Sequence, residues 1–278
     1  MSKKVRLDTF LVEKGFFDSR EKAKRSIMAG LVFHHTERLD KPGLKIDPAI
    51  DVTVKGKAIP YVSRGGLKLE KALKVFKISL NDRLVMDIGS STGGFTDCSL
   101  QNGAKEVYAI DVGYNQLDWK LRNDPRVHVM ERTNFRYVTL DDLNHGLPNM
   151  AVTDVSFISL KLIFPVLKHL LLDQSDIVAL IKPQFEAGRE QVGKKGIIRD
   201  PKIHEEVIRT ITNFVYDEGF DLLGLDYSPI TGGDGNIEFL LHARWTGDVP
   251  QTDINSSRIS EVVQLAHQDF SQKKKSNN

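Results

Sequence analysis

From Asp82 onward, short apolar segments alternate with amphipathic segments, and this alternation restricts the fold more than any other feature of the sequence. The apolar segments are typical of buried strands, and the segments between them have helical spacing. Strands that alternate with helices predict a doubly wound, Rossmann-like α/β sheet. The expected strands are 84–88, 107–111, 127–130, 150–154 and 177–182, followed by a closing pair at 222–228 and 237–245.

The first 60 residues have a different pattern and predict a small, separate α+β unit. Apolar residues at helical spacing indicate two short helices, and β-like pieces follow them. This segment holds 13 Lys and Arg against 8 Asp and Glu, whereas the whole chain has a formal charge of only +2. The basic surplus favours contact with a polyanion, and a solvated basic surface is the alternative.

The change of pattern along the chain predicts four segments. Residues 1–60 form the basic head, and residues 61–81 form a linker with a leading helix. Residues 82–247 form the α/β domain. Residues 248–278 form a C-terminal extension that we expect to be partly helical with a frayed tail, because it ends in a polar, lysine-rich run.

A glycine-rich turn after the first strand of the α/β domain indicates a cofactor site. Ligands of such sheets bind beyond the carboxyl ends of the strands, and Asp111, at the end of the second strand, suits the hydroxyls of a ribose. The turn is neither G-x-G-x-x-G nor a Walker motif, and its acidic residue, Asp87, opposes a pyrophosphate. These features favour S-adenosylmethionine, which is cationic; a turn that only begins a helix is the alternative. The candidate cofactor-binding residues are Asp87, Gly89, Ser90, Ser91, Gly93, Gly94, Asp111 and Asn134.

Four ionisable residues are expected around the same cleft. Asp154 and Lys182 end the fourth and fifth strands, Glu238 lies in the closing strand, and Lys68 lies on the leading helix. Each of them alone could simply begin a solvated loop. Together they predict a catalytic group at the rim where a substrate would lie.

The order Lys68, Asp154, Lys182, Glu238 resembles the K-D-K-E tetrad of ribose 2′-O-methyltransferases of the FtsJ type. The turn Gly89-Ser-Ser-Thr-Gly-Gly-Phe95 resembles that family's Gly-Ala-Ala-Pro-Gly-Gly-Trp, with Thr92 in place of Pro and Phe95 in place of Trp. In the head, Arg6-Leu7-Asp8, Ser19-Arg20-x-x-Ala23 and Asp40-Lys41-Pro42 look like the S4 RNA-binding domain. His34-His35-Thr36 departs from its usual Val-Asn-Gly-like turn. With Asp154-Val-Ser-Phe-Ile-Ser and Gly235-Asn-Ile-Glu-Phe-Leu, the chain resembles the TlyA/hemolysin A family of ribosomal-RNA 2′-O-methyltransferases from near residue 3 to about residue 245.

This resemblance implies a fold, an activity and a set of roles. The fold is an S4 domain followed by a class I methyltransferase domain, and the activity is methyl transfer from S-adenosylmethionine to a ribose 2′-hydroxyl of ribosomal RNA, free or in a ribosomal subunit. Lys182 would orient the hydroxyl or accept its proton, and Asp154 would hold Lys182, with Lys68 and Glu238 completing the network. The residues expected to bind RNA are Lys4, Arg6, Arg20, Lys24, Lys41 and Arg64.

Two other functions remain open, a non-catalytic RNA- or ribosome-binding factor with a methyltransferase-like fold and a membrane-active hemolysin. The second is disfavoured because no stretch approaches the roughly 18 apolar residues of a membrane helix and no export signal is visible. A single cysteine, Cys98, fits a reducing cytoplasm, and one cysteine with eight scattered histidines argues against a structural zinc site, so we expect no metal. The sequence assigns neither the modified nucleotide nor an oligomeric state.

Overall fold

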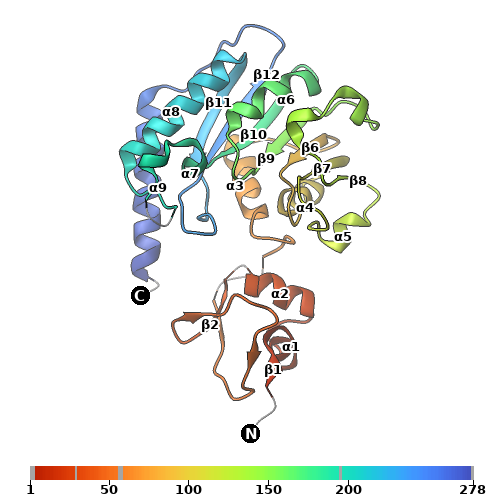
Figure 1. Cartoon of the computed structure of the whole chain (residues 1–278), viewed down its shortest axis with the longest axis vertical. Coiled ribbons are helices and arrows are strands. Elements are labelled where there is room, and N and C mark those ends of the chain that lie inside the picture. Colours follow the sequence, from red (N-terminus) through yellow and green to blue (C-terminus); the bar gives the residue numbers. More distant parts are fainter. Residues whose placement is uncertain (1–3, 29, 56–58, 194–195, 277–278) are drawn as a thin grey trace. The chain divides into compact units, whose positions relative to one another are not determined.

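The computed structural model describes residues 4–28, 30–55, 59–193 and 196–276, and the chain divides into two compact units, Met1–Gly66 and Leu67–Asn278 (Figure 1). The smaller unit has two helices followed by short strands, as the sequence predicts, and a two-residue strand before the helices that the sequence does not predict. Its elements are β1 (Val5–Arg6), α1 (Leu7–Glu13), α2 (Arg20–Met28), β2 (Val32–His34), β3 (Glu37–Arg38), β4 (Lys45–Ile46) and β5 (Thr53–Val54).

The two helices of the smaller unit bury the apolar faces that their spacing predicts. Leu7 and Leu11 of α1 pack with Ala23 and Ile27 of α2, and all four are fully buried. The strands form two antiparallel sheets, one of order β3-β2-β5 and one that pairs β1 with β4. The core of this unit therefore holds α1 and α2 against a minimal β framework.

The larger unit is built on a seven-stranded sheet of order β11-β12-β10-β9-β6-β7-β8. The five strands from β10 to β8 are parallel, whereas β12 runs antiparallel to both β10 and β11. The strands are β6 (Leu84–Ile88), β7 (Glu106–Ile110), β8 (Val127–Met130), β9 (Met150–Thr153), β10 (Ser175–Ile181), β11 (Phe220–Tyr227) and β12 (Phe239–Trp245). This order confirms the predicted doubly wound α/β class with its closing strand pair.

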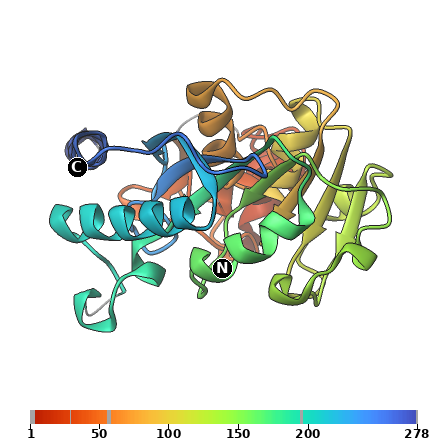
Figure 2. The same ribbon diagram turned by 90° about the horizontal axis from the view of Figure 1, so that it is seen from above.

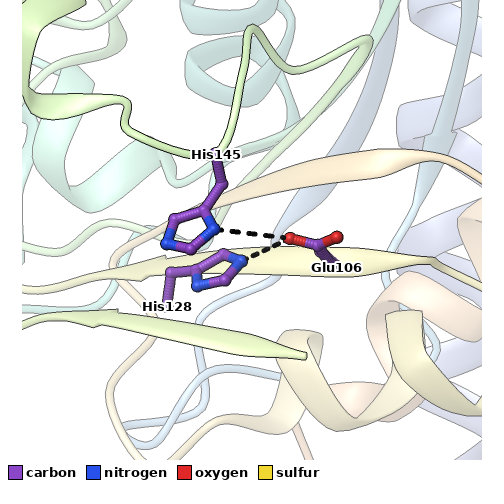
Figure 3. Close-up of side chains that lie close together, drawn as sticks. All are labelled: Glu106, His128 and His145. Atoms are coloured by element: carbon purple, nitrogen blue, oxygen red, sulfur yellow. Dashed lines mark hydrogen bonds and ion pairs between the residues drawn. The ribbon is translucent and has the colours of Figure 1, made fainter. Parts of the chain in front are cut away.

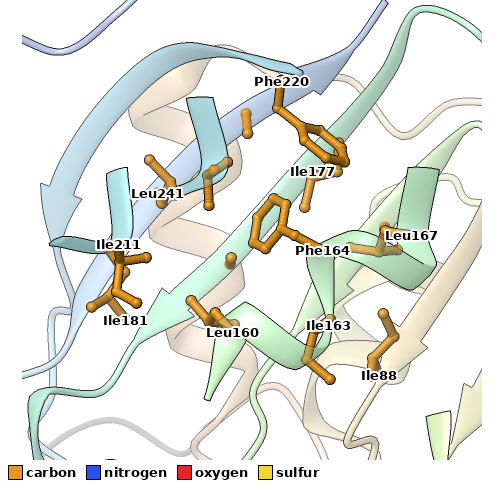
Figure 4. Packing of buried hydrophobic residues seen from close by; sticks show 14 of the residues in the cluster. Ile88, Leu160, Ile163, Phe164, Leu167, Ile177, Ile181, Ile211, Phe220 and Leu241 are labelled. Carbon is orange, nitrogen blue, oxygen red and sulfur yellow. The ribbon is translucent and has the colours of Figure 1, made fainter. Parts of the chain in front are cut away.

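Helices cover both faces of this sheet (Figure 2). Helices α3 (Gly66–Phe76) and α4 (Gly94–Gln101) lie on one face, and α6 (Phe164–Leu170) and α8 (Pro201–Asp217) lie on the other. The second face holds the larger core, in which Phe164 packs edge-on against Phe220 with ring centroids 5.0 Å apart (Figure 4). The remaining helical elements are α5 (Trp119–Arg122), α7 (Pro183–Glu186), α9 (Ser256–Ser276) and the 3-10 turns η1 (Phe135–Tyr137), η2 (Leu140–Asp142), η3 (Leu160–Leu162) and η4 (Arg189–Gln191).

The C-terminal extension forms one long helix, α9, which packs against α8 and β11. Fraying is expected of the tail from Lys273 onward, but α9 continues to Ser276, and residues 277–278 lie outside the described residues. Among the helices that the structure describes, none is both long and apolar enough to span a membrane.

Candidate active site

The four residues expected to act in catalysis converge at the carboxyl ends of the parallel strands in the large sheet. Asp154 directly follows β9 and Lys182 directly follows β10, and these strands are parallel neighbours. Glu238 directly precedes β12, rather than lying within it, and because β12 is antiparallel to β10 its first residues meet the end of β10. Lys68 reaches the same place from α3.

The four side chains form one group of ion pairs, called here the KDKE cluster. Asp154 lies between the lysines, with Lys68 Nζ 3.0 Å from Oδ2 and Lys182 Nζ 2.6 Å from Oδ1. Lys68 Nζ is also 2.6 Å from Glu238 Oε2, and Lys182 Nζ donates a hydrogen bond of 2.9 Å to Ser156 Oγ. The most exposed of the four side chains, Asp154, is only 17% accessible. Two cations and two anions therefore balance each other where little water can enter.

The pKa shifts in the cluster keep its central pair charged. Burial lowers the pKa of Lys68, but the Asp154 and Glu238 carboxylates outweigh it and raise that pKa above its ordinary value. Burial raises the pKa of Asp154, but the Lys68 and Lys182 ammonium groups outweigh it, and the net direction is downward. At neutral pH, Asp154 is thus a carboxylate that can hold Lys182 in a fixed position.

A cavity of about 530 Å³ lies beside the KDKE cluster. Asp154 and Ser156, the two partners of Lys182, lie in its wall, so the cluster opens onto the cavity through them. Of the predicted cofactor-binding residues, four line it: Gly89, Ser91, Asp111 and Asn134. Its volume falls within the roughly 300–1,000 Å³ of small-molecule and cofactor sites.

The glycine turn is fitted closely to the strand that carries Asp154. Gly89 has a φ of +80°, and a Cβ on it would lie 3.2 Å from the carbonyl oxygen of Asp154, so a larger residue would be strained there. Across the cavity wall, Asp111 accepts hydrogen bonds from the backbone N–H groups of Ser91 (2.8 Å) and Gly113 (2.6 Å). One carboxylate therefore ties the turn to the end of β7 and retains further acceptor capacity.

The other predicted cofactor-binding residues lie behind the cavity wall. Ser90 is buried, and Gly93 and Gly94 begin α4, where a Cβ on Gly93 would come within 2.3 Å of Leu121. The structure therefore gives Gly93 a packing role beside helix α5. Asp87, at 0% exposure, accepts a 2.6 Å hydrogen bond from Thr96.

Comparison with known proteins identifies the group to which this arrangement belongs. Residues 61–245 match the profile of the FtsJ-like methyltransferases, and residues 5–49 match the S4 domain. The chain is 61% identical over 274 residues to the Bacillus subtilis protein YqxC, a match that covers 98% of both chains. It is 40% identical over 249 residues to the 16S/23S rRNA (cytidine-2′-O)-methyltransferase TlyA of Mycobacterium tuberculosis, covering 89% of this chain and 92% of TlyA. The chain belongs to the TlyA/hemolysin A family of FtsJ-like methyltransferases.

A solved structure supports the same assignment. A hemolysin-named protein from Streptococcus thermophilus is 55% identical in sequence and superposes with a TM-score of 0.80, over 99% of this chain and 100% of that one. The family and the fold that the sequence predicts, an S4 domain followed by an FtsJ-like methyltransferase domain, are therefore confirmed.

Sequence reasoning missed two residues of the family motif that follows β9. Ser156 accepts the Lys182 hydrogen bond, and Phe157 is 91% exposed at the cavity, with its ring 4.8 Å from that of Phe185. Phe157 also has a φ of +62°, which is uncommon for an aromatic residue. The signal was present, because both residues lie within Asp154-Val-Ser-Phe, but periodicity does not reveal an apolar side chain that points to solvent.

In the S4 unit, two of the predicted RNA-binding arginines share one buried carboxylate. Arg6 and Arg20 each lie 3.0 Å from Asp8 Oδ2, and both arginine side chains are about half exposed whereas Asp8 is fully buried. The hydrogen bond from Arg6, opposed by burial and assisted by Arg20, holds the pKa of Asp8 well below its usual range. The backbone N–H of Asp8 donates to Pro42, which brings the loop of Lys41 beside the two arginines.

The other predicted RNA-binding residues are distributed along the S4 unit. Lys4 and Lys41 are exposed and Lys24 is half-buried on α2. Arg64, near the end of this unit, is half-buried. The structure thus connects Arg6 and Arg20 through Asp8, whose backbone also binds the loop of Lys41.

The pKa of Asp87, which lies beside the glycine turn, is strongly shifted. Burial, opposed by the Thr96 hydrogen bond and assisted by the nearby Asp154 and Asp111 charges, raises the pKa of Asp87 to about 7. Its unfolded value is near 4, so between about pH 4 and pH 7 the folded state binds more protons than the unfolded state. This carboxyl group therefore removes stability as the pH rises through that range.

We expect Asp87→Asn to abolish that loss, because an amide has no charge to bury. At pH 8 the variant should exceed the wild type in free energy of unfolding by a few kcal/mol, on the order of 2–4, and at pH 5 the difference should be much smaller. Urea unfolding followed by tryptophan fluorescence measures this, since both tryptophans, Trp119 and Trp245, lie in the larger unit. The exposed Asp141→Asn is the matched control and should follow the wild type. An unchanged pH profile in Asp87→Asn would contradict the assignment.

Proposed function

We propose that this protein transfers a methyl group from S-adenosylmethionine to a ribose 2′-hydroxyl of ribosomal RNA. The observation that carries the proposal is the KDKE cluster, which opens through Asp154 and Ser156 onto a cavity that Asp111 also lines. A non-catalytic RNA-binding factor would have no use for two buried lysines held at the rim of such a cavity. The relatives agree, because TlyA of Mycobacterium tuberculosis is named an rRNA (cytidine-2′-O)-methyltransferase.

The cavity suits S-adenosylmethionine in shape and charge. Asp111 has acceptor capacity for the two ribose hydroxyls, and the positive φ of Gly89 lets the backbone turn without a side chain in the way. Ser91 and Asn134 lie in the same wall and offer polar groups. Asp111 and Asp154 also make the wall favourable for a cation. When bound, the cofactor supplies a methyl group on a positively charged sulfur.

The protein's own contribution to the reaction lies in position and charge. Lys182, fixed by Asp154 and Ser156, orients the 2′-hydroxyl. After its ammonium group releases one proton to solvent through the cavity, the neutral amine of Lys182 takes up the hydroxyl proton as the oxygen becomes nucleophilic. Lys68, itself paired with Glu238, holds Asp154 from the other side. Much of the acceleration comes from holding the reacting atoms in line within a space that excludes water. Phe157, exposed at the mouth of the cavity, offers a face on which the base of the target nucleotide can stack.

The S4 unit supplies the hold on folded RNA. Arg6 and Arg20, preset by Asp8, and the nearby Lys41 loop offer a cluster of cations to phosphates. Such contacts recognise RNA by shape more than by sequence. Ribosomal RNA, free or within a subunit, is the substrate that this combination of an S4 unit and a 2′-O-methyltransferase domain fits.

Asp111→Ala should weaken S-adenosylmethionine binding by about 1–3 kcal/mol, or roughly five- to 150-fold, because hydrogen bonds to partly buried hydroxyls are lost. Isothermal titration calorimetry on the full chain measures the affinity. The exposed Asp141→Ala is the control and should bind as the wild type does. If the wild type binds no S-adenosylmethionine even with RNA present, the cofactor assignment is wrong.

Lys182→Ala should lower the single-turnover rate of methyl transfer by at least about 100-fold, because the group that orients the hydroxyl and takes its proton is gone. Lys182→Arg should fail as well, since a guanidinium stays protonated and its planar fork does not match the site of an ammonium. Excess enzyme and tritiated cofactor on ribosomal subunits from a strain lacking this protein give the rate. Lys168→Ala, which removes a surface ion pair with Glu218, is the matched control. Near-normal transfer by Lys182→Ala would favour the non-catalytic alternative.

A double variant, Lys24→Ala with Lys41→Ala, should weaken RNA binding and lower its salt dependence. Each lost phosphate contact reduces the slope of log affinity against log salt by about 0.7–0.9, so the pair should reduce it by about 1.4–1.8. These lysines are preferred to Arg6 and Arg20, whose loss would leave the buried Asp8 without its cations. Affinity for S-adenosylmethionine should not change. Lys105→Ala with Lys168→Ala, in the larger unit, is the control, and the same slope in both double variants would exclude the S4 unit as the anchor.

A further inference from the structure

Two histidines and a glutamate meet at the amino ends of the parallel strands, whereas the KDKE cluster lies at their carboxyl ends. Glu106 is the first residue of β7 and His128 the second of β8, so both lie near the amino ends of parallel strands. His145 comes from the loop between η2 and β9 and lies over them (Figure 3). Asp111 and the cofactor cavity lie past the carboxyl end of β7, so this group belongs to a different site.

The three side chains direct their ligand atoms at one point. His128 Nε2 is 2.6 Å and His145 Nδ1 is 3.8 Å from the same oxygen, Glu106 Oε2 (Figure 3). The two imidazole rings are stacked, with centroids 3.4 Å apart and planes 14° from parallel. One nitrogen from each histidine and one oxygen from the glutamate lie within 4.8 Å of one another. A metal ion needs donors at this spacing, because bonds of about 2.0–2.2 Å to zinc bring its ligands to within a few ångströms of each other.

The backbone around the group is fixed by Tyr108. Tyr108 pairs with His128 in the register of β7 and β8, and Glu106 is two residues before it, so all three side chains share a face of the sheet. The Tyr108 hydroxyl accepts a 2.7 Å hydrogen bond from the backbone N–H of His145 and donates one of 3.1 Å to the carbonyl of Gly146. The loop that carries His145 is therefore held against the sheet without any bond from its imidazole.

Charge and access also suit a cation. Glu106 contributes a carboxylate to the group, and its Oε2 faces both histidines. Lys105 approaches its other oxygen, Oε1, at 3.9 Å and leaves Oε2 to the histidines. The His145 side chain is 49% exposed and that of His128 only 14%, so the group opens to solvent on one side. Water can complete a coordination shell there.

We propose that Glu106, His128 and His145 bind one divalent transition-metal ion of the zinc class. Two imidazole nitrogens and one carboxylate oxygen suit zinc, cobalt or nickel, whereas magnesium and calcium prefer oxygen ligands alone. The bound ion ties the loop before β9 to the edge strand β8 and its neighbour β7. One cysteine and eight scattered histidines predicted no metal, and the three residues proposed here lie 22 and 17 positions apart along the chain. The site is independent of the methyltransferase activity.

Zinc titration of the full chain tests the site. Protein without an affinity tag, stripped with a chelator, is titrated with zinc chloride at a constant pH of 7.5, because metal affinity depends on pH. The wild type should bind one equivalent at this site, and Glu106→Gln, His128→Ala and His145→Ala should each weaken that binding by at least tenfold. His169→Ala, an exposed histidine on α6, is the matched control and should bind as the wild type does. Cobalt should give a visible absorption band of a nitrogen- and oxygen-ligated ion in the wild type and in His169→Ala only.

A stability measurement keeps the test decisive if a variant folds poorly. His145 is half exposed, so His145→Ala should fold, and zinc should raise the melting temperature of the wild type and of His169→Ala but not of His145→Ala. Zinc binding that is absent from the wild type, or unchanged in His145→Ala and Glu106→Gln, would overturn the proposal and leave an ordinary Glu106–His128 ion pair with a histidine stacked on it.

Discussion

The arrangement of the KDKE cluster depends on the charge of Asp154, which lies between two buried lysines. Removing one ion from water costs several kcal/mol, and the cost is recovered only when opposite charges lie at hydrogen-bonding distance. Lys68 and Lys182 meet that condition on the two oxygens of one carboxylate, and Glu238 takes the remaining side of Lys68. Displacing any of the elements that carry these residues would leave a buried charge uncompensated. The ion pairs therefore fix α3 and the ends of three strands relative to one another.

This constraint extends to the cofactor cavity through the backbone. Gly89 approaches the carbonyl of Asp154 so closely that only a glycine fits without strain, so the position of the glycine turn follows from the position of β9. Asp111 then ties the turn to β7 through the N–H of Ser91. The chemistry proposed for Lys182 and the binding proposed for Asp111 thus share one framework, which methyl transfer requires because the reacting atoms must be held in line.

The S4 unit also contains a buried carboxylate paired with two cations, but there the cations remain partly exposed. Asp8 is fully buried, and Arg6 and Arg20 both bind it while leaving about half of their own surface exposed. A buried carboxylate therefore orders two guanidinium groups at the surface, and ordered cations lose less entropy when they meet a phosphate. Buried charge organises the KDKE cluster in one unit and a basic surface in the other.

The sequence by itself determined the classes of structure and the residues of the KDKE cluster. Hydrophobic periodicity and glycine positions are local properties, so the strands, the glycine turn and the change of pattern after the S4 unit could be predicted, and the order of four ionisable residues matched a family. Only the tertiary structure decided which side chains meet. Sheet register and loop position set the distances between side chains. They bring Lys182 to Ser156, leave Phe157 exposed and place Gly93 against Leu121. They also bring together Glu106, His128 and His145 at the amino ends of the strands. Such contacts depend on the pairing of strands that are far apart in the sequence, and no local sequence pattern specifies that pairing.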